Sequence, residues 1–200
     1  MSTTIAPAQR MNVAEFLGWT EARPDDRYEL VDGAVVAMTR DTVRHNRAKA
    51  SAWRALDDAV RKAGLDCVVL VDGVGIAISD HTVRTPDVLV HCGAEPDPDA
   101  MLIESPLIVV EVVSRSSEHD NTDAKLVEYF SVPSVHHYLI IFSEKRVVVH
   151  HQRNRQGTLD TRIVSEGEIA LNPPGMSVSV AALLGLPSSG GAALGSGFGS

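Results

Sequence analysis

The segment Leu107–Ser114, LIVVEVVS, constrains the fold of this chain more than any other. A short, continuous apolar run rich in valine and isoleucine is typical of a strand that is covered on both faces of its sheet. A single charged residue, Glu111, interrupts this run. An ionised carboxylate buried there destabilises the fold unless it is compensated. A neighbouring cation, a bound metal ion or a proton taken up at a raised pKa would each compensate it.

Composition excludes several classes of protein. The 200 residues suffice for one sizeable core, and no apolar run approaches the ~20 residues of a membrane span. The formal net charge of -8 argues against a protein that coats nucleic acid through bulk charge, although a local basic groove remains compatible with it. The start, MSTTIAPAQR, has no apolar core of a secretory signal, so we expect a cytoplasmic protein. Cys67 and Cys92 lack CxxC spacing and are predicted to be reduced thiols.

Hydrophobic periodicity and turn residues predict the order of the elements. A helix begins after Asn12, which forms a capping-box pattern with Glu15. A longer helix runs from Asp41 or Thr42 to about Lys62, with Gly64 as its expected stop, and a third ends near Phe130. The expected strands are the hairpin Tyr28–Met38 around Asp32-Gly33, then Cys67–Val71, Val74–Ser79, Val83–His91, the central strand, Val135–Phe142, Arg146–His151 and Leu159–Val164. Ser177–Leu186 is expected to form a short closing helix.

This interleaving of helices and strands predicts an α/β fold with a mixed central sheet flanked by helices. We expect one domain over residues 11–187, preceded by a flexible tail at residues 1–10. Residues 188–200, SSGGAALGSGFGS, have the Gly/Ser-rich composition of a disordered tail.

Two carboxylates are predicted to meet on neighbouring strands. Asp87 lies among apolar residues in the segment TPDVLV, upstream of the central strand that carries Glu111. Side chains opposite each other on paired strands have Cβ atoms about 4.5–5.5 Å apart. Two carboxylates so close repel unless a proton or a divalent cation lies between them. Oxygen ligands without a supporting cysteine favour magnesium, manganese or calcium over zinc.

A lysine follows on the next predicted helix. Lys125 and Tyr129, within DNTDAKLVEY, are four residues apart and share one helix face. A helix that folds back over the end of the central strand would direct the Lys125 ammonium at the two carboxylates. There it would hold a nucleophilic water or offset charge on a phosphate.

Asp87 after a proline, the buried Glu111 and the later lysine together resemble the PD-(D/E)xK nuclease superfamily. Within it the chain resembles the Uma-type family of proposed restriction endonucleases, which implies a restriction-endonuclease-like core. The matching pieces, in the family's order, are YELVDGAVV, His45 at the start of the long helix, TPDVLV, IVVEVVSRSS, KLVEYF and VPSVHHYLII.

The chain departs from these patterns at three places. The superfamily's lysine two residues after the glutamate is Val113 here, a feature shared by Uma-type proteins, in which the counterpart of Lys125 takes over the role. The family's aspartate before the lysine corresponds to either Asp120 or Asp123. Arg115 stands where the family commonly has proline, and it could add a contact to phosphate.

The resemblance implies an endonuclease that depends on Mg²⁺ or Mn²⁺ and hydrolyses phosphodiester bonds, with DNA as the expected substrate. Asp87, Glu111 and the carbonyl oxygen of Val112 would hold the ion, which would lower the pKa of a bound water. Lys125 would position that water for attack. Glu29, in the family's first hairpin, would support a second ion or orient Lys125, and His45 would contact phosphate or order the helix start.

Other functions compete with this interpretation. A catalytically inactive protein with the nuclease fold could bind nucleic acid or assemble with partners, as the acidic net charge suggests. A structural domain of a toxin-like or mobile-element system is a third possibility. Because cutting both strands of a duplex needs two sites, we also expect a homodimer.

Overall fold

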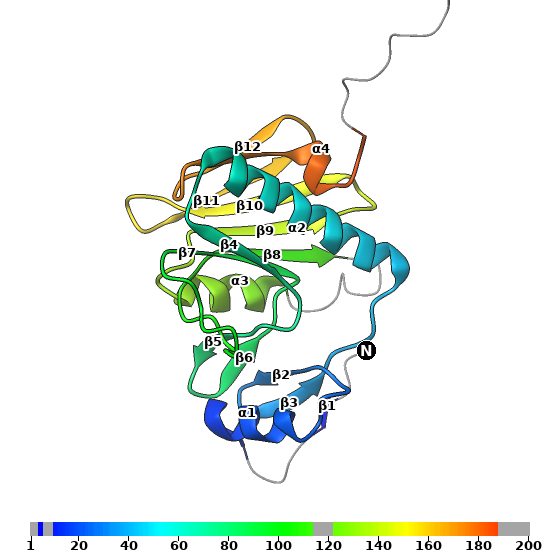
Figure 1. Cartoon of the computed structure of the whole chain (residues 1–200), viewed down its shortest axis with the longest axis vertical. Coiled ribbons are helices and arrows are strands. Elements are labelled where there is room, and N and C mark those ends of the chain that lie inside the picture. Colours follow the sequence, from blue (N-terminus) through cyan, green and yellow to red (C-terminus); the bar gives the residue numbers. More distant parts are fainter. Residues whose placement is uncertain (1–3, 6–9, 114–121, 188–200) are drawn as a thin grey trace, which may run out of the picture.

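The computed structural model describes residues 4–5, 10–113 and 122–187, which contain two main sheets (Figure 1). The larger sheet has six strands in the order β11-β10-β9-β8-β7-β4. Their bounds are β4 Cys67–Val71, β7 Val88–Cys92, β8 Pro106–Val113, β9 His137–Phe142, β10 Val147–Arg153 and β11 Leu159–Val164. β8 and β9 run parallel, whereas the other neighbours are antiparallel. The predicted mixed sheet, with the Glu111 strand at its centre, is therefore confirmed.

The smaller sheet has five strands in the order β1-β3-β2-β6-β5. Their bounds are β1 Thr4–Ile5, β2 Tyr28–Val31, β3 Ala34–Ala37, β5 Ile76–Ser79 and β6 Thr82–Arg84. Two residues of the expected N-terminal tail thus pair with β3. The rest of that tail up to residue 9, and the expected tail at 188–200, lie outside the described residues.

Helices cover both faces of the larger sheet (Figure 1). On one face lie α2 (Val43–Ala63), α4 (Val180–Leu183) and the hairpin of β12 (Glu168–Leu171) and β13 (Met176–Ser179). On the other face α3 (Thr122–Ser131) packs with β5 over a second core. α1 (Val13–Glu21) packs on the smaller sheet, where Phe16 enters a third core.

Local sequence signals explain the element ends. Asn12 and Glu15 form the predicted capping box at the start of α1. Thr42, one of the two predicted caps, accepts a hydrogen bond from the backbone of α2, and Gly64 ends this helix in the left-handed conformation with φ 63°.

Two sequence predictions of secondary structure are wrong. The expected strand Val83–His91 is divided, with β6 in the smaller sheet and β7 in the larger one. Pro86 lies at the division, where its missing N–H suits a change of sheet. The second error concerns Ser177–Leu186, where a strand, β13, precedes a helix of only four residues.

The expectation of two reduced thiols is also wrong. Cys67 and Cys92 form a disulfide, with Cα atoms 4.0 Å apart. They are directly opposite each other on the antiparallel strands β4 and β7. The spacing along the chain could not reveal this contact, because it arises from strand register. The cross-link ties the outermost strand β4 to the rest of the sheet.

Reducing this disulfide is expected to lower the free energy of unfolding by about 3 kcal/mol, because a link between residues 25 apart restricts the unfolded chain. Urea unfolding with and without reductant measures the effect. The double variant Cys67→Ala/Cys92→Ala is the control and should be insensitive to reductant. Two titratable thiols in the untreated protein would contradict the structure.

A buried pair of histidines joins β9 and β10 to the β12–β13 turn. His137 Nδ1 lies 2.9 Å from His150 Nε2, and His137 Nε2 lies 2.8 Å from the carbonyl oxygen of Pro173. The carbonyl requires a proton on His137 Nε2, so His137 Nδ1 accepts from His150. Burial lowers the pKa of both histidines to about 4. Repulsion from His150 lowers the pKa of His137 further, and repulsion from Arg162 does the same for His150.

Stability should therefore fall in weak acid. The unfolded histidines bind protons below a pKa of about 6.5, whereas the folded ones resist protonation until about 4. Their stabilisation is complete above pH ~6.5 and is lost as the pH falls towards 4, by roughly 2–3 kcal/mol for each histidine. Denaturant unfolding across this pH range measures the slope. His150→Gln retains a donor to His137 and should halve the slope, whereas an unchanged slope would exclude the pair as its cause.

The described residues contain no helix that is both long enough and apolar enough to cross a membrane.

Candidate active site

Glu111 of β8 is buried and bonded to the helix that follows it. The Lys125 ammonium donates to Glu111 Oε1 at 2.8 Å, and the Tyr129 hydroxyl donates to the same oxygen at 2.7 Å. Lys125 and Tyr129 lie one turn apart on α3, as their spacing predicted. The amphipathic face of α3 thus brings both donors over the centre of the sheet.

Asp87 reaches the same part of β8 from the start of the neighbouring strand β7. It precedes β7, and its Oδ2 accepts the backbone N–H of Val112 at 2.6 Å. Because Val112 follows Glu111 in the chain, this bond brings the two predicted metal-binding carboxylates to one short segment of backbone. The carbonyl of Val112, the third predicted ligand, belongs to the same segment.

Glu29 is fixed beside this segment by a buried cluster of charges. Its Oε2 accepts from Arg84 at 2.8 Å, and its Oε1 accepts the backbone N–H of Thr85 at 3.0 Å. The Arg84 guanidinium also forms two hydrogen bonds to Glu128 of α3, at 2.6 and 2.9 Å. Lys125 Nζ lies 3.9 Å from Glu29 Oε1. Glu29 therefore lies within ion-pair distance of Lys125, as the predicted role of orienting that lysine requires.

His45 faces Asp87 from the first turn of α2. Its ring Nε2 lies 3.5 Å from Asp87 Oδ1 and 3.6 Å from Asp41 Oδ1. Its backbone N–H donates to the capping hydroxyl of Thr42. The hydrogen bond to Asp87 raises the pKa of His45, and burial opposes it. The ring is thus directed at a carboxylate of the site.

Sequence reasoning missed Lys49, which is only 2% exposed. Its ammonium lies 3.1 Å from Asp87 Oδ1, 2.5 Å from Asp41 and 2.9 Å from Asp72. The available signal was its place in α2, four residues after His45 and next to the apolar stripe that includes Ala48. Lys49 is the cation that compensates Asp87, as Lys125 compensates Glu111.

The two carboxylates have opposite pKa shifts. Burial tends to raise the pKa of Asp87, but the hydrogen bond from His45, the charge of Lys49 and the Val112 N–H lower it below its usual value. Burial raises the pKa of Glu111, and the charges of Asp87 and Glu29 add to this against Lys125. Asp87 is therefore held ionised, whereas negative charge at Glu111 is only partly compensated.

The Lys125 ammonium is held in its charged form. Burial alone would lower its pKa, but the charges of Glu111 and Glu29 raise it well above the usual value. Neutral lysine is not available here at physiological pH, so Lys125 acts as a hydrogen-bond donor and a positive charge.

The donor set fits one hard divalent cation. In the part of the chain that the structure describes, no three His, Cys, Asp or Glu side chains gather as metal ligands. Two carboxylates and a carbonyl remain, and Mg²⁺ is commonly held by one or two carboxylates together with waters. Burial and the charges of Asp87 and Glu29 raise the pKa of Glu111, and a bound cation would oppose this shift.

Arg115, the predicted phosphate contact, and Asp120, one candidate for the family's aspartate, fall outside the described residues. Asp123, the other candidate, is exposed in the first turn of α3.

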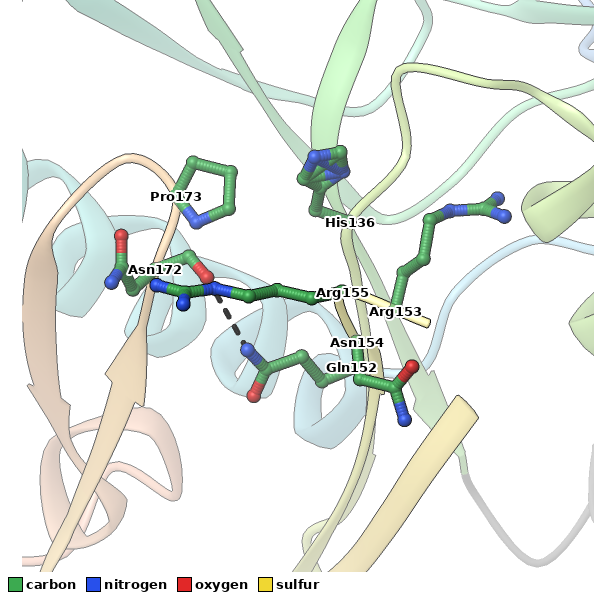
Figure 2. A pocket seen from close by; sticks show the side chains of 7 residues that line it. All are labelled: His136, Gln152, Arg153, Asn154, Arg155, Asn172 and Pro173. Carbon is green, nitrogen blue, oxygen red and sulfur yellow. Dashed lines mark hydrogen bonds between the residues drawn. The ribbon is translucent and has the colours of Figure 1, made fainter. Parts of the chain in front are cut away.

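A basic hollow of about 380 Å³ lies at the opposite end of the central strands (Figure 2). Its lining residues are His136, Gln152, Arg153, Asn154, Arg155, Asn172 and Pro173. Glu111 pairs with Ile140, four residues beyond His136, which places the hollow about 13 Å further along the sheet. Arg153 donates to the carbonyls of Val135 and Phe130, so this guanidinium ties β10 to the end of α3. The hollow is separate from the candidate site.

Comparison with solved structures identifies the fold. A crystal structure from Anabaena variabilis, described as a "putative nuclease belonging to DUF820", superposes with a TM-score of 0.68. The match covers 88% of this chain and 98% of that chain, at 13% sequence identity. A likeness at this identity shows a shared fold, and the fold is the predicted one.

Sequence comparison identifies the family. Two uncharacterised proteins of Synechocystis sp. strain PCC 6803 are similar along most of their length: slr1290 is 26% identical and sll1609 is 25% identical. The matches cover 88% and 82% of this chain, and 92% and 94% of the relatives. A family model, Uma2, described as "Putative restriction endonuclease", matches residues 13–184 and so includes every residue of the candidate site. With this match over most of its length, the chain belongs to the Uma2 family.

Proposed function

We propose that the protein is an endonuclease that uses Mg²⁺ or Mn²⁺ to hydrolyse phosphodiester bonds, with DNA as substrate. One observation carries the proposal: Asp87 accepts the backbone N–H of Val112, the residue after Glu111, and a charged lysine donates directly to Glu111. The Uma2 family and the nuclease fold support the same reaction class.

In this mechanism Asp87, Glu111 and the carbonyl of Val112 would hold the ion. The bound ion would polarise a phosphate oxygen and lower the pKa of a coordinated water. Lys49 and His45 keep Asp87 ionised and oriented. Lys125 donates to the attacking water or to a phosphate oxygen, and Glu29 fixes the position of its ammonium. Arg115 is proposed as a contact to phosphate.

A second function is favoured by one specific observation. Glu111 already has two internal donors, Lys125 and Tyr129, which would stabilise it without an ion. In that case the protein would be a catalytically inactive member of the nuclease fold that binds nucleic acid or assembles with partners. The net charge of -8 disfavours binding to bulk nucleic acid, so of these two roles it favours assembly with partners.

Calorimetric titration with Mg²⁺ and Mn²⁺, followed by cleavage assays on the same samples, tests the proposal. Supercoiled plasmid and single-stranded DNA serve as substrates, and EDTA serves as the negative control. We expect one ion per chain and cleavage that EDTA abolishes. An ion that binds without cleavage of either substrate would favour a different substrate or an inactive enzyme. Neither binding nor cleavage would reject the metal site and favour the second function.

A further inference from the structure

β11 is an edge strand of the larger sheet. It pairs with β10 on one side, and no other described strand pairs with it (Figure 1). Five of its six residues are exposed, including Leu159 at 40% and Ile163 at 73%. The ladder between β10 and β11 runs through six consecutive residue pairs without a register shift. An edge of this kind, with neither proline nor bulge, is a template for another strand.

The other edge of the same sheet is protected. β4 is mostly half-buried and is linked to β7 by the disulfide. The indole N–H of Trp53, on α2, donates to the carbonyl of Val69 at 2.9 Å. A helix over the strand is a common means of blocking an edge. Among the described residues, no helix covers β11 in this way.

We propose that β11 pairs antiparallel with β11 of a second copy of this chain, so that the two larger sheets join into one. The sequence of β11, LDTRIV, is self-complementary about Thr161. Antiparallel pairing centred there places Leu159 opposite Ile163 of the partner subunit, and Asp160 opposite the partner's Arg162. Each of these pairs occurs twice, because a two-fold interface uses the same surface on both copies.

Side-chain direction supports this register. Thr161 shares its face of the sheet with His151, and Leu159 and Ile163 point to that same face because strand residues alternate. Asp160 and Arg162 point to the opposite face. The two-fold pairing thus forms an apolar row on one face and two opposite-charge pairs on the other. Opposite pairs of these kinds stabilise antiparallel strands, whereas like charges in the same places destabilise them.

The symmetry has a consequence for the candidate site. A two-fold axis between antiparallel strands is perpendicular to the sheet, so α3 of both copies lies on the same side. Three strand spacings separate β8 from β11 in each copy. With the spacing between the two β11 strands, the Glu111 residues would be roughly 34 Å apart in a flat sheet. Two candidate sites on one side of the assembly could act on the two strands of one duplex, if the protein is a nuclease.

Light scattering coupled to size-exclusion chromatography tests the proposal on the full chain. At micromolar concentration we expect twice the chain mass. In Arg162→Asp, both charge pairs become pairs of aspartates, and we expect the dissociation constant of the dimer to rise about tenfold. Arg155→Asp is the matched control: it makes the same charge change in the exposed β10–β11 turn and should leave the dimer intact.

The charge-swapped variant Asp160→Arg/Arg162→Asp is the sharper test. It restores an opposite charge to each position across the two-fold axis, so dimerisation should recover. A monomeric wild type would overturn the proposal, as would a dimer that Arg162→Asp does not weaken. A swapped variant that stays monomeric while circular dichroism shows it folded would also overturn this register. None of these measurements depends on nuclease activity, so the two proposals can fail separately.

Discussion

Glu111→Gln is expected to lower the affinity for Mg²⁺ or Mn²⁺ at least about a hundredfold and to abolish cleavage. Substituting a residue that only hydrogen-bonds to a metal ligand already lowers metal affinity 10- to 100-fold. Glu111→Gln removes the charge of a proposed ligand itself. The substitution preserves the shape of a buried side chain, and its amide can still accept from Lys125 and Tyr129. Calorimetric titration and plasmid cleavage measure both effects.

Glu104→Gln provides the control for this experiment. Glu104 is an exposed glutamate in the segment before β8, so the same change there should alter neither ion binding nor cleavage. Thermal unfolding of both variants shows whether the fold survives. A folded Glu111→Gln protein that binds the ion like the wild type would place the metal elsewhere or give Glu111 a purely structural role.

Arg84→Met is expected to lower the free energy of unfolding by about 3–5 kcal/mol, the largest effect on stability that we anticipate from a single substitution. Arg84 is 6% exposed and joins Glu29 of β2 to Glu128 of α3. Its removal leaves Glu29, which is 7% exposed, without its main cation. Glu128 retains more contact with water, so most of the loss should come from Glu29. The two main sheets are joined at this point through α3, so the loss should affect the whole chain.

Arg61→Met tests whether this effect depends on burial. Arg61 also pairs with a carboxylate, Asp57, but its side chain is 71% exposed on α2. Exposed pairs of this kind contribute about 0.3–0.5 kcal/mol. Denaturant unfolding of both variants should therefore separate them clearly. A small effect of Arg84→Met would mean that water reaches Glu29, and a partial recovery in Glu29→Gln/Arg84→Met would confirm that the uncompensated carboxylate is responsible.

Much of the fold could be predicted because its signals are local. The Asn12–Glu15 capping box, the Asp32-Gly33 turn and the Gly64 helix end depend on neighbouring residues, and each is present. The apolar run around Glu111 correctly predicted a central strand, because burial on both faces leaves no alternation. The four-residue spacing of Lys125 and Tyr129 likewise predicted a shared helix face.

The features that could not be predicted depend on register and on packing between distant elements. Cys67 and Cys92 meet only because β4 and β7 pair in one register. Lys49 resembles any helix lysine until the loops that carry Asp41, Asp72 and Asp87 are placed around it. Arg84 could not be distinguished from an ordinary strand residue, because its two glutamate partners lie 44 and 55 residues away in the sequence. Charge clusters of this kind produce no periodic pattern in the sequence.

Diffraction from crystals of the full chain soaked with Mn²⁺, recorded at the manganese absorption edge, would show whether an ion binds at Asp87 and Glu111. We expect one anomalous peak per chain, with Asp87, Glu111 and the carbonyl of Val112 as its protein ligands and Lys125 beside it. A crystal in which Mn²⁺ binds elsewhere, or binds nowhere while Lys125 and Tyr129 still hold Glu111, would contradict this expectation.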